Sequence, residues 1–208
     1  MRKRYVATLL SVLLTSAFTG AAFAAGTPVV LRLAEIHEAN YPTTVGDFEI
    51  ARLVEQRTNG HVKIEVYDGM KLGDEAAVIQ KILAGEIDLT RVNIGPLAHY
   101  VPSLNAFLMP YVFRDTDHML KVVNGAVGND VIASFDQHGF IGFGWFDGGT
   151  RNFYTKKAVR KPADLKGMRI RSMQSTLMIS VISAFGAEAI AMPHGKVFDA
   201  LKDNSLDG

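Results

Sequence analysis

The chain of 208 residues contains no cysteine, which excludes disulfide bonds and thiol chemistry. It also lacks the G-x-S-x-G elbow of serine hydrolases and the Walker-type phosphate loop of nucleotide-binding enzymes. Its six histidines are scattered without a close ligand pair, so their spacing gives no support for a metal site. The most familiar catalytic signatures are therefore missing.

Long apolar runs are scarce, and the clearest one stands at the N-terminus. Three basic residues, Arg2 to Arg4, precede a largely apolar stretch from Tyr5 to Phe18, and Ala22-Phe23-Ala24 follows as an A-x-A cleavage site. The apolar stretch is short for a membrane-spanning helix. Residues 1–24 are therefore predicted to be a signal peptide that is removed after Ala24 when the protein is exported.

An excess of one charge is also absent from the mature chain. The predicted signal peptide holds three of the 22 basic residues and no acidic residue, which leaves 19 basic against 21 acidic residues and a net charge of −2. This balance gives no reason to expect binding to nucleic acid or to an acidic membrane.

Apolar periodicity in the first part of the mature chain predicts strands separated by helices, the pattern of an α/β fold. Predicted strands are Val29–Ala34, Val62–Tyr67, Ile87–Asn93 and Ile141–Phe146; predicted helices are Thr43–Thr58, Asp74–Leu83, Asn129–His138 and a segment from Asp115 or Asp117 to Val123.

The glycine-rich turn Asp147-Gly-Gly149 is the predicted crossover between two lobes, residues 25–148 and residues 149–208. For the second lobe the pattern predicts further strands and helices. The strands are Arg151–Thr155, Met168–Arg171 and Ala189–Met192, and the helices lie near Thr176–Phe185 and Lys196–Lys202.

Two arginines, Arg151 and Arg171, flank the polar turn Pro162–Gly167. If the strands on either side of this turn are neighbours, both guanidinium groups lie on one side of the lobe. A guanidinium binds a carboxylate through two parallel hydrogen bonds, so the pair is a candidate anion clamp. The alternative is that both are surface arginines that contact only water.

Several segments, in order, resemble TRAP-type (tripartite ATP-independent periplasmic) solute-binding proteins, many of which bind C4-dicarboxylates or other organic acids. They are Asn59–Tyr67, Lys71–Asp74, Ala84–Asp88, Leu108–Phe113, Gly149–Arg151, Lys161–Arg171, Phe185–Ala187, Val197–Leu201 and Leu206–Gly208. The resemblance implies a two-lobe α/β fold of the periplasmic-binding-protein type II-like class. It also implies that Arg171 holds the ligand carboxylate with help from Arg151.

Four further residues are candidates for ligand contacts. Gln174 follows Arg171 by three residues, and His194 lies in a Met-Pro-His turn where the resembled family places a ligand-facing side chain. His37 and Asn93 follow the first and third predicted strands, at the ends where α/β proteins bind ligands. The alternative for each is a polar residue without a role in binding.

In the resembled family, an Asp-Gly pair such as Asp207-Gly208 lies in the middle of the protein. The resemblance therefore implies that the second lobe is incomplete here. With about 60 residues it buries only a modest fraction of its surface. Residues 25–208 alone are expected to be poorly stable, to bind organic acids weakly or not at all, and to be better ordered in the first lobe.

Together these features predict a monomeric periplasmic solute-binding protein, not an enzyme. It would capture a small carboxylate ligand and deliver it to the membrane permease subunits of a TRAP transporter, without a cofactor and without binding nucleic acid. Two alternatives remain open: a periplasmic enzyme that acts on a carboxylated substrate, and a nonfunctional fragment of a binding protein.

Overall fold

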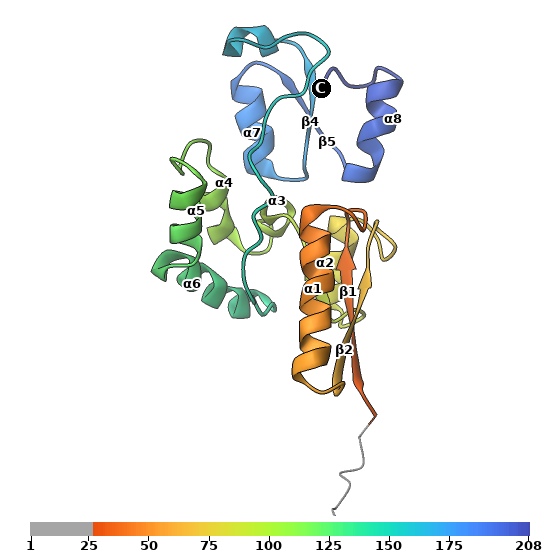
Figure 1. The fold of residues 1–208 in the computed structure, drawn as a ribbon. Helices are drawn as coiled ribbons and strands as arrows, with labels where there is room; N and C mark the ends of the chain where they lie inside the picture. Colours follow the sequence, from red (N-terminus) through yellow and green to blue (C-terminus); the bar gives the residue numbers. More distant parts are fainter. Residues whose placement is uncertain (1–26) are drawn as a thin grey trace, which may run out of the picture.

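A computed structural model describes residues 27–208, so the predicted signal peptide and its cleavage site lie outside the described residues. The fold is α/β and contains two parallel sheets, one of three strands in the order β2-β1-β3 and one of two strands, β4 and β5. Figure 1 shows the two sheets, each with its helices, stacked along the long axis of the molecule. Within residues 27–208, no helix is both long enough and apolar enough to cross a membrane.

The first sheet and its helices form the first lobe. Its strands are β1 (Val29–Glu35), β2 (Val62–Tyr67) and β3 (Leu89–Arg91). Its α-helices are α1 (Pro42–Arg57), α2 (Glu75–Leu83), α3 (Ile94–Leu97), α4 (Asn105–Leu108), α5 (Thr116–Val123) and α6 (Ala126–Ala133). Two 3-10 helices complete it, η1 (Pro102–Leu104) and η2 (Ser134–His138).

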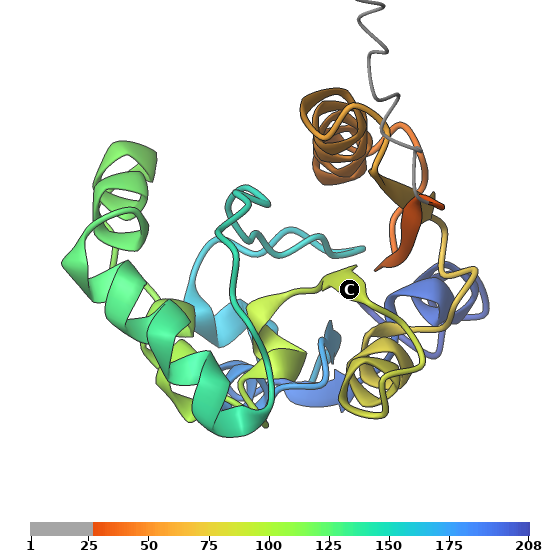
Figure 2. The same cartoon turned by 90° about the horizontal axis from the view of Figure 1, so that it is seen from below.

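Strand β1 is the centre of the first sheet, and its alternating side chains divide between two helices. Helices α1 and α2 lie on opposite faces of the sheet (Figure 2). On one face Ala34 packs with Val78 of α2 and with Ile87. Because successive side chains of a strand point to opposite faces, Glu35 belongs to the face that α1 covers. The end of β1 therefore places a carboxyl group beneath α1.

Helix α1 covers the sheet with polar residues at its start. Thr43, Thr44 and Asp47 are buried, whereas Val45 and Phe48 are 53% and 40% exposed. Val45 and Phe48 are three residues apart on one face of this helix, and their apolar side chains would favour burial of that face. The first two turns of α1 therefore face the sheet with polar side chains, because the polar end of β1 lies beneath this part of the helix.

The largest apolar core lies beside the first sheet, among the helices that follow β3. Ile79 of α2 packs there with Val101, Leu104 and Phe135, and Trp145 of the connecting segment packs against this cluster. Helix α5 begins at the predicted place because the Asp115 side chain accepts a hydrogen bond from the amide of His118 at 2.7 Å.

The second sheet and its helices form the second lobe. Its elements are η3 (Pro162–Leu165), β4 (Arg169–Ser172), α7 (Thr176–Ala184), β5 (Glu188–Ala191), η4 (His194–Lys196) and α8 (Val197–Lys202). Its core is a small cluster of Leu165, Ile170, Ile182 and Ala187. The backbone amide of Arg171 also donates to the carbonyl of Gly208, so the last residues run along the other edge of β4.

Two predicted strands are absent from the structure, and a third was predicted too long. Residues 141–146 and 151–155 form no strand, and β3 covers three residues rather than the seven predicted. Ile141 and Phe143 are exposed at 74% and 81%, because no neighbouring strand pairs with this extended segment in the described residues. Residues 139–161 instead connect the lobes without a helix or strand, and a lobe boundary at Gly149 within them stays a prediction.

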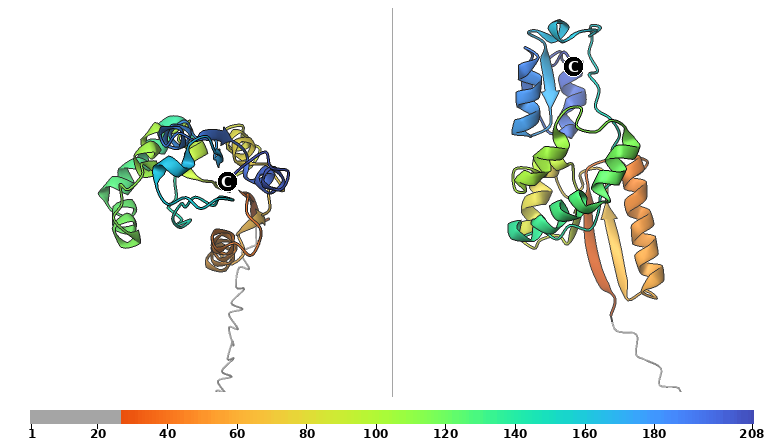
Figure 3. Two further views of the ribbon diagram at one scale, coloured as in Figure 1. Left: turned by 90° about the horizontal axis from the view of Figure 1, so that it is seen from above. Right: turned by 90° about the vertical axis from the view of Figure 1, so that its left-hand side faces the viewer.

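The two lobes contact each other closely on one side of the connection. A Cβ atom on Gly95 of α3 would lie 1.9 Å from the sulfur of Met173, and one on Gly195 would lie 2.6 Å from Cε of Met70. Both glycines therefore allow backbone of one lobe to meet a methionine of the other. The right-hand view of Figure 3 shows the second lobe standing directly over the first.

Candidate functional site

The candidate site lies where the ends of β1 and β3 and the start of α2 meet the second lobe. Parallel strands end together at one edge of a sheet, so the residues that follow β1 and β3 are brought to the same edge. The turn after β5, with His194, faces this edge from the other lobe. The site therefore draws residues from both lobes.

Arg171 is the third residue of β4, and its side chain is held at one point. Its Nε donates to the carbonyl oxygen of Met192 at 3.0 Å. The structure records no hydrogen bond and no ion pair from its two terminal nitrogens to any of residues 27–208. The guanidinium is thus oriented through Nε while its outer edge remains available for a bidentate contact.

Arg151 reaches the same place without the strand that was predicted to carry it. Its Nη2 lies 3.8 Å from the sulfur of Met173, and no acidic partner forms an ion pair with it among the described residues. Arg151 is among the groups that lower the pKa of Arg171, as a second positive charge in the vicinity does. The strand predicted for Arg171 is confirmed by β4, whereas the strand predicted for Arg151 is wrong.

The pKa values of both arginines are lowered. Arg151 is reached by solvent, yet surrounding protein desolvates it, and this is the main cause that lowers its pKa. Burial is also the main cause that lowers the pKa of Arg171. In both cases Glu75 acts in the opposite direction. Two partly desolvated cations without a bonded anion favour an incoming carboxylate.

Glu75 is a site residue that the sequence did not single out. It is 6% exposed at the first position of α2, after Asp74, whose side chain caps the helix by accepting from the Ala77 amide at 2.9 Å. Glu75 Oε1 accepts from the backbone amide of Asn93 at 2.9 Å and from its Nδ2 at 2.5 Å. Acidic residues are common in the first turn of a helix, so the sequence alone does not distinguish Glu75, and only its burial in the structure does.

The same contact fixes Asn93, one of the predicted site residues. Its amide side chain is held by Glu75 at the end of β3, so its carbonyl oxygen keeps a defined direction. Gln174 differs, because it lies in the bend between β4 and α7 with an exposed side chain. The described residues give no contact that brings Gln174 to the other five candidates.

His37 and His194 meet across the two lobes. Their ring centroids are 5.4 Å apart at an angle of 57°. His37 is also stacked on Tyr41, with centroids 4.0 Å apart and planes within 8° of parallel. Burial, followed by the charges of His37 and Arg171, lowers the pKa of His194, while Glu75 opposes this. His194 therefore lies in the same positive region as the arginines.

The position of His37 is set by a buried ion pair that the sequence did not reveal. Glu35 Oε1 accepts from the His37 backbone amide at 2.7 Å and contacts its Nδ1 at 2.8 Å. Arg91, the neighbour of Glu35 in the sheet register, donates to both oxygens of this carboxylate. Nη2 of Arg91 also contacts Nδ1 of His37, so this ring nitrogen is engaged by the ion pair and Nε2 is the nitrogen left for a ligand.

A cavity of about 310 Å³ opens beside Tyr41. Its walls come from the start of α1 and from the connection between the lobes: Tyr41, Pro42, Thr43, Asp147, Gly148 and Gly149. Residues 27–208 contain no group of three or more histidine or acidic side chains arranged to hold a metal ion.

Comparison with protein families gives a match over residues 33–208 to the family described as bacterial extracellular solute-binding protein, family 7. The chain belongs to this family. It is therefore a member of the TRAP-type solute-binding proteins, which confirms the resemblance seen in the sequence. Because this family consists of solute-binding proteins, an enzymatic role loses most of its support.

Solved structures agree with this assignment. A TRAP periplasmic solute-binding protein from Pseudomonas putida F1 with bound D-glucuronate is 40% identical, with a TM-score of 0.83 over 86% of this chain and 60% of that one. A second from Xanthobacter autotrophicus Py2 with bound β-D-galacturonate is 35% identical, with a TM-score of 0.84 and the same coverage. The two-lobe α/β fold class is thereby confirmed as a partial fold.

Curated relatives point the same way. The 2,3-diketo-L-gulonate-binding periplasmic protein of Escherichia coli K12 is 33% identical over 74% of this chain and 48% of its own length. The C4-dicarboxylate-binding periplasmic protein of Rhodobacter capsulatus is 25% identical over 87% of this chain and 55% of its own. The chain spans about half the length of the curated relatives that it matches.

Proposed function

We propose that this protein captures a small organic acid in the cleft between its lobes and delivers it to the membrane permease subunits of a TRAP transporter. The observation that carries the proposal is the pair of partly desolvated guanidinium groups, Arg151 and Arg171, which have no acidic partner among residues 27–208. A carboxylate placed between them gains charge-assisted hydrogen bonds and replaces the solvation that the arginines lack.

Arg171 is proposed to make the bidentate contact, because its Nε is already bonded to Met192 and its outer edge faces no protein acceptor in the described residues. Arg151 adds a second positive charge. His194 closes the second-lobe side, and His37 and Asn93 supply polar contacts from the first lobe as the lobes close. Gln174 is the weakest candidate, since its side chain is exposed and no contact with this group is recorded in the described residues.

The ligand class that fits best is a monocarboxylate that carries hydroxyl groups, such as a hexuronate. Glu75 is buried beside the arginines, and a carboxylate accepts hydrogen bonds from hydroxyl groups but repels a second carboxylate. Relatives with bound D-glucuronate and β-D-galacturonate support this class. A structure with bound succinate from Sulfurospirillum deleyianum, 26% identical, makes a C4-dicarboxylate the second candidate.

Export is part of the proposal. Relatives of known role are periplasmic proteins, and the basic and apolar N-terminus with its A-x-A site supports removal of residues 1–24 and a mature N-terminus at Ala25. In the periplasm the protein is proposed to act as a monomer, with one ligand held between two lobes and no cofactor.

A thermal-shift screen tests the proposal. Hexuronates, aldonates and C4-dicarboxylates are added separately to the purified protein, with the uncharged sugar D-glucose as control. A ligand that binds the folded state raises the melting temperature, and the stabilisation grows with the logarithm of ligand concentration above Kd. Stabilisation by a hexuronate without stabilisation by D-glucose supports the function; a hexuronate and D-glucose that act alike contradict it.

A further inference from the structure

Two buried carboxyl groups lie close to His37 and to the start of α1, which follows Tyr41. Glu35 at the end of β1 and Asp47 in the second turn of α1 are each 1% exposed. Burial of two carboxyl groups in one place is costly unless cations or protons compensate them. The described residues supply one full ion pair here, between Glu35 and Arg91.

The charge of Glu35 is well compensated by hydrogen-bond donors. It accepts from Nε of Arg91 at 2.5 Å, from Nη2 of the same arginine, and from the backbone and ring of His37. Burial acts to raise the pKa of Glu35, but the hydrogen bonds from His37 and Arg91 outweigh it and hold the pKa at about 2. The negative charge of this pair of carboxyl groups therefore belongs to Glu35.

Asp47 has no such support. Its Oδ2 is fully buried without a hydrogen-bond partner in the described residues. Burial first, and then the neighbouring Glu35 carboxylate, raise the pKa of Asp47 to about 7, and Arg91 opposes this only in part. A protonated Asp47 would donate its O–H to the Glu35 carboxylate, as two adjacent carboxyl groups that share one proton do.

The other charged groups around Asp47 do not replace this proton. Arg91 of β3 is already bonded to Glu35, and His37 lies one hydrogen bond beyond. On β2, the strand on which α1 also packs, Lys63 and Glu65 are exposed.

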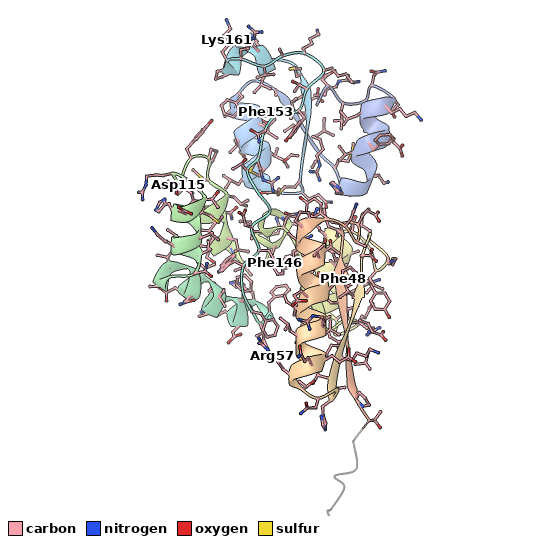
Figure 4. All side chains as sticks on the ribbon, viewed as in Figure 1. Phe48, Arg57, Asp115, Phe146, Phe153 and Lys161 are labelled. Carbon is pink, nitrogen blue, oxygen red and sulfur yellow. The ribbon has the colours of Figure 1, made fainter. Side chains whose placement is uncertain are left out.

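The connecting segment contributes Phe146, which packs on Gly46 of α1 and is labelled beside this helix in Figure 4. Asp147 of that segment accepts from the amide of Gly149 at the rim of the cavity.

Two sets of contacts connect the Asp47–Glu35 pair to the rings of His37 and Tyr41. Glu35 holds the backbone and ring of His37 directly. Asp47 lies on the helix that begins immediately after Tyr41, and Tyr41 stacks on the His37 ring and lines the cavity. A change in how α1 sits on β1 is therefore transmitted to both rings.

We propose that Asp47 is a positioning residue for ligand binding: one proton shared between Asp47 and Glu35 seats the start of α1 on β1 and holds His37 and Tyr41 in place at the cleft. Loss of that proton puts a second negative charge beneath the cleft, which disturbs this wall and disfavours an anionic ligand. The consequence for affinity rests on the proposed function; the shared proton and its effect on the two rings do not.

Carbon-13 NMR titration tests the proton without any ligand. We expect the Asp47 carboxyl carbon to titrate near neutral pH rather than near its usual value of about 4. The ring signals of His37 and Tyr41 should shift with the same midpoint. In Asp47→Asn, whose amide keeps the shape of the protonated acid, this shared midpoint should vanish, and it should remain in Asp130→Asn, a control at an exposed position of α6.

Either of two results would overturn the inference: an Asp47 carboxyl that titrates near its usual value, or ring signals of His37 and Tyr41 that do not follow it. The titration of the unsubstituted protein decides both, even if Asp47→Asn proves unstable.

D-Glucuronate affinity extends the test to binding. We expect affinity about fivefold or more weaker at about pH 8.5 than at about pH 6, within the usual range of coupling between two sites. Asp47→Asn keeps the histidines, so it should lose only the part of this dependence that Asp47 supplies. An identical pH dependence in both proteins contradicts the positioning role. If Asp47 titrates near pH 7 as expected but no organic acid binds, the proposed function is contradicted and the shared proton is not.

Discussion

The rings of His37 and His194 lie 5.4 Å apart, one following β1 of the first lobe and the other opening the turn after β5 of the second. This contact joins parts of the chain that are more than 150 residues apart, and it lies beside the two arginines that have no acidic partner in residues 27–208. A ligand held by Arg171 would therefore meet both lobes at once, which is the geometry that closure on a ligand requires.

Arg171→Ala should weaken binding of D-glucuronate about tenfold or more, since a charge-assisted pair contributes roughly 1.5–3 kcal/mol. Arg171→Lys should recover only part of the loss, because an ammonium group cannot present two parallel donors. Titration calorimetry measures both. Arg160→Ala, at an exposed position before η3, is the matched control and should bind normally. Equal affinity of the lysine variant and the original protein would remove the bidentate contact from the account.

Glu75→Gln should change which acids bind. The amide no longer repels a second carboxylate, so the affinity for succinate relative to that for D-glucuronate should rise. Competition binding against both ligands gives this ratio directly. Glu86→Gln, an exposed position beyond the end of α2, serves as control. A ratio unchanged in Glu75→Gln would mean that Glu75 does not face the ligand.

Ligand binding should raise the pKa of His194. Burial and the nearby charges of His37 and Arg171 now lower it, and an anion bound beside these groups stabilises the imidazolium form. NMR titration of the histidine ring with and without D-glucuronate reports the change. A His194 pKa that falls or stays constant on binding would place the carboxylate elsewhere.

The stability of the folded state should depend on pH through Asp47. Its folded-state pKa of about 7 lies above its ordinary value of 3.8, so its stabilising contribution is full below that value and is lost as pH rises through about 7. Glu35, held at about 2, acts in reverse, and its contribution is lost as pH falls below its ordinary 4.5. As the pH rises from about 4.5 to about 7, the free energy of unfolding should therefore decrease, on the order of 1–4 kcal/mol in total.

Denaturant unfolding at a series of pH values measures this slope, and Asp47→Asn should flatten it. A profile that rises across the same interval in the original protein would contradict the raised pKa of Asp47.

Removal of the Asp74 cap should cost about 1 kcal/mol of stability, as loss of a side-chain cap usually does. The Asp74 side chain accepts from the Ala77 amide at 2.9 Å and starts the helix whose first residue is Glu75. Asp74→Ala should therefore also speed hydrogen exchange at Asn93, whose amide donates to Glu75. Unfolding and exchange measurements, with Asp130→Ala as the exposed control, check both effects.

Local patterns predicted much of this fold. The bounds of β2 match the predicted strand Val62–Tyr67. Helix α2 is capped by its predicted start, Asp74, and α5 by Asp115, the first of its two predicted starts. Such features depend on neighbours in sequence, which the sequence displays. The strands expected at 141–146 and 151–155 failed because a strand needs a partner, and no pattern within a segment reveals whether one is present.

The candidate site divides in a similar way. Arg171, Arg151, His37 and His194 lie together, and Asn93 is held beside them by Glu75. Glu75 was missed because an acid at the start of a helix is common, and Glu35 because its charge is compensated by Arg91, 56 residues later. Burial and pairing between distant residues are tertiary properties, so these two acids emerge only from the structure.

The central claim is that the arginine pair binds a carboxylate, and one comparison tests it most directly: calorimetric titration of the protein with D-glucuronate and with its uncharged amide, which has nearly the same shape. The account predicts that the amide binds at least about tenfold more weakly, because it cannot accept two charge-assisted hydrogen bonds from Arg171. Equal affinity for the acid and the amide would contradict it.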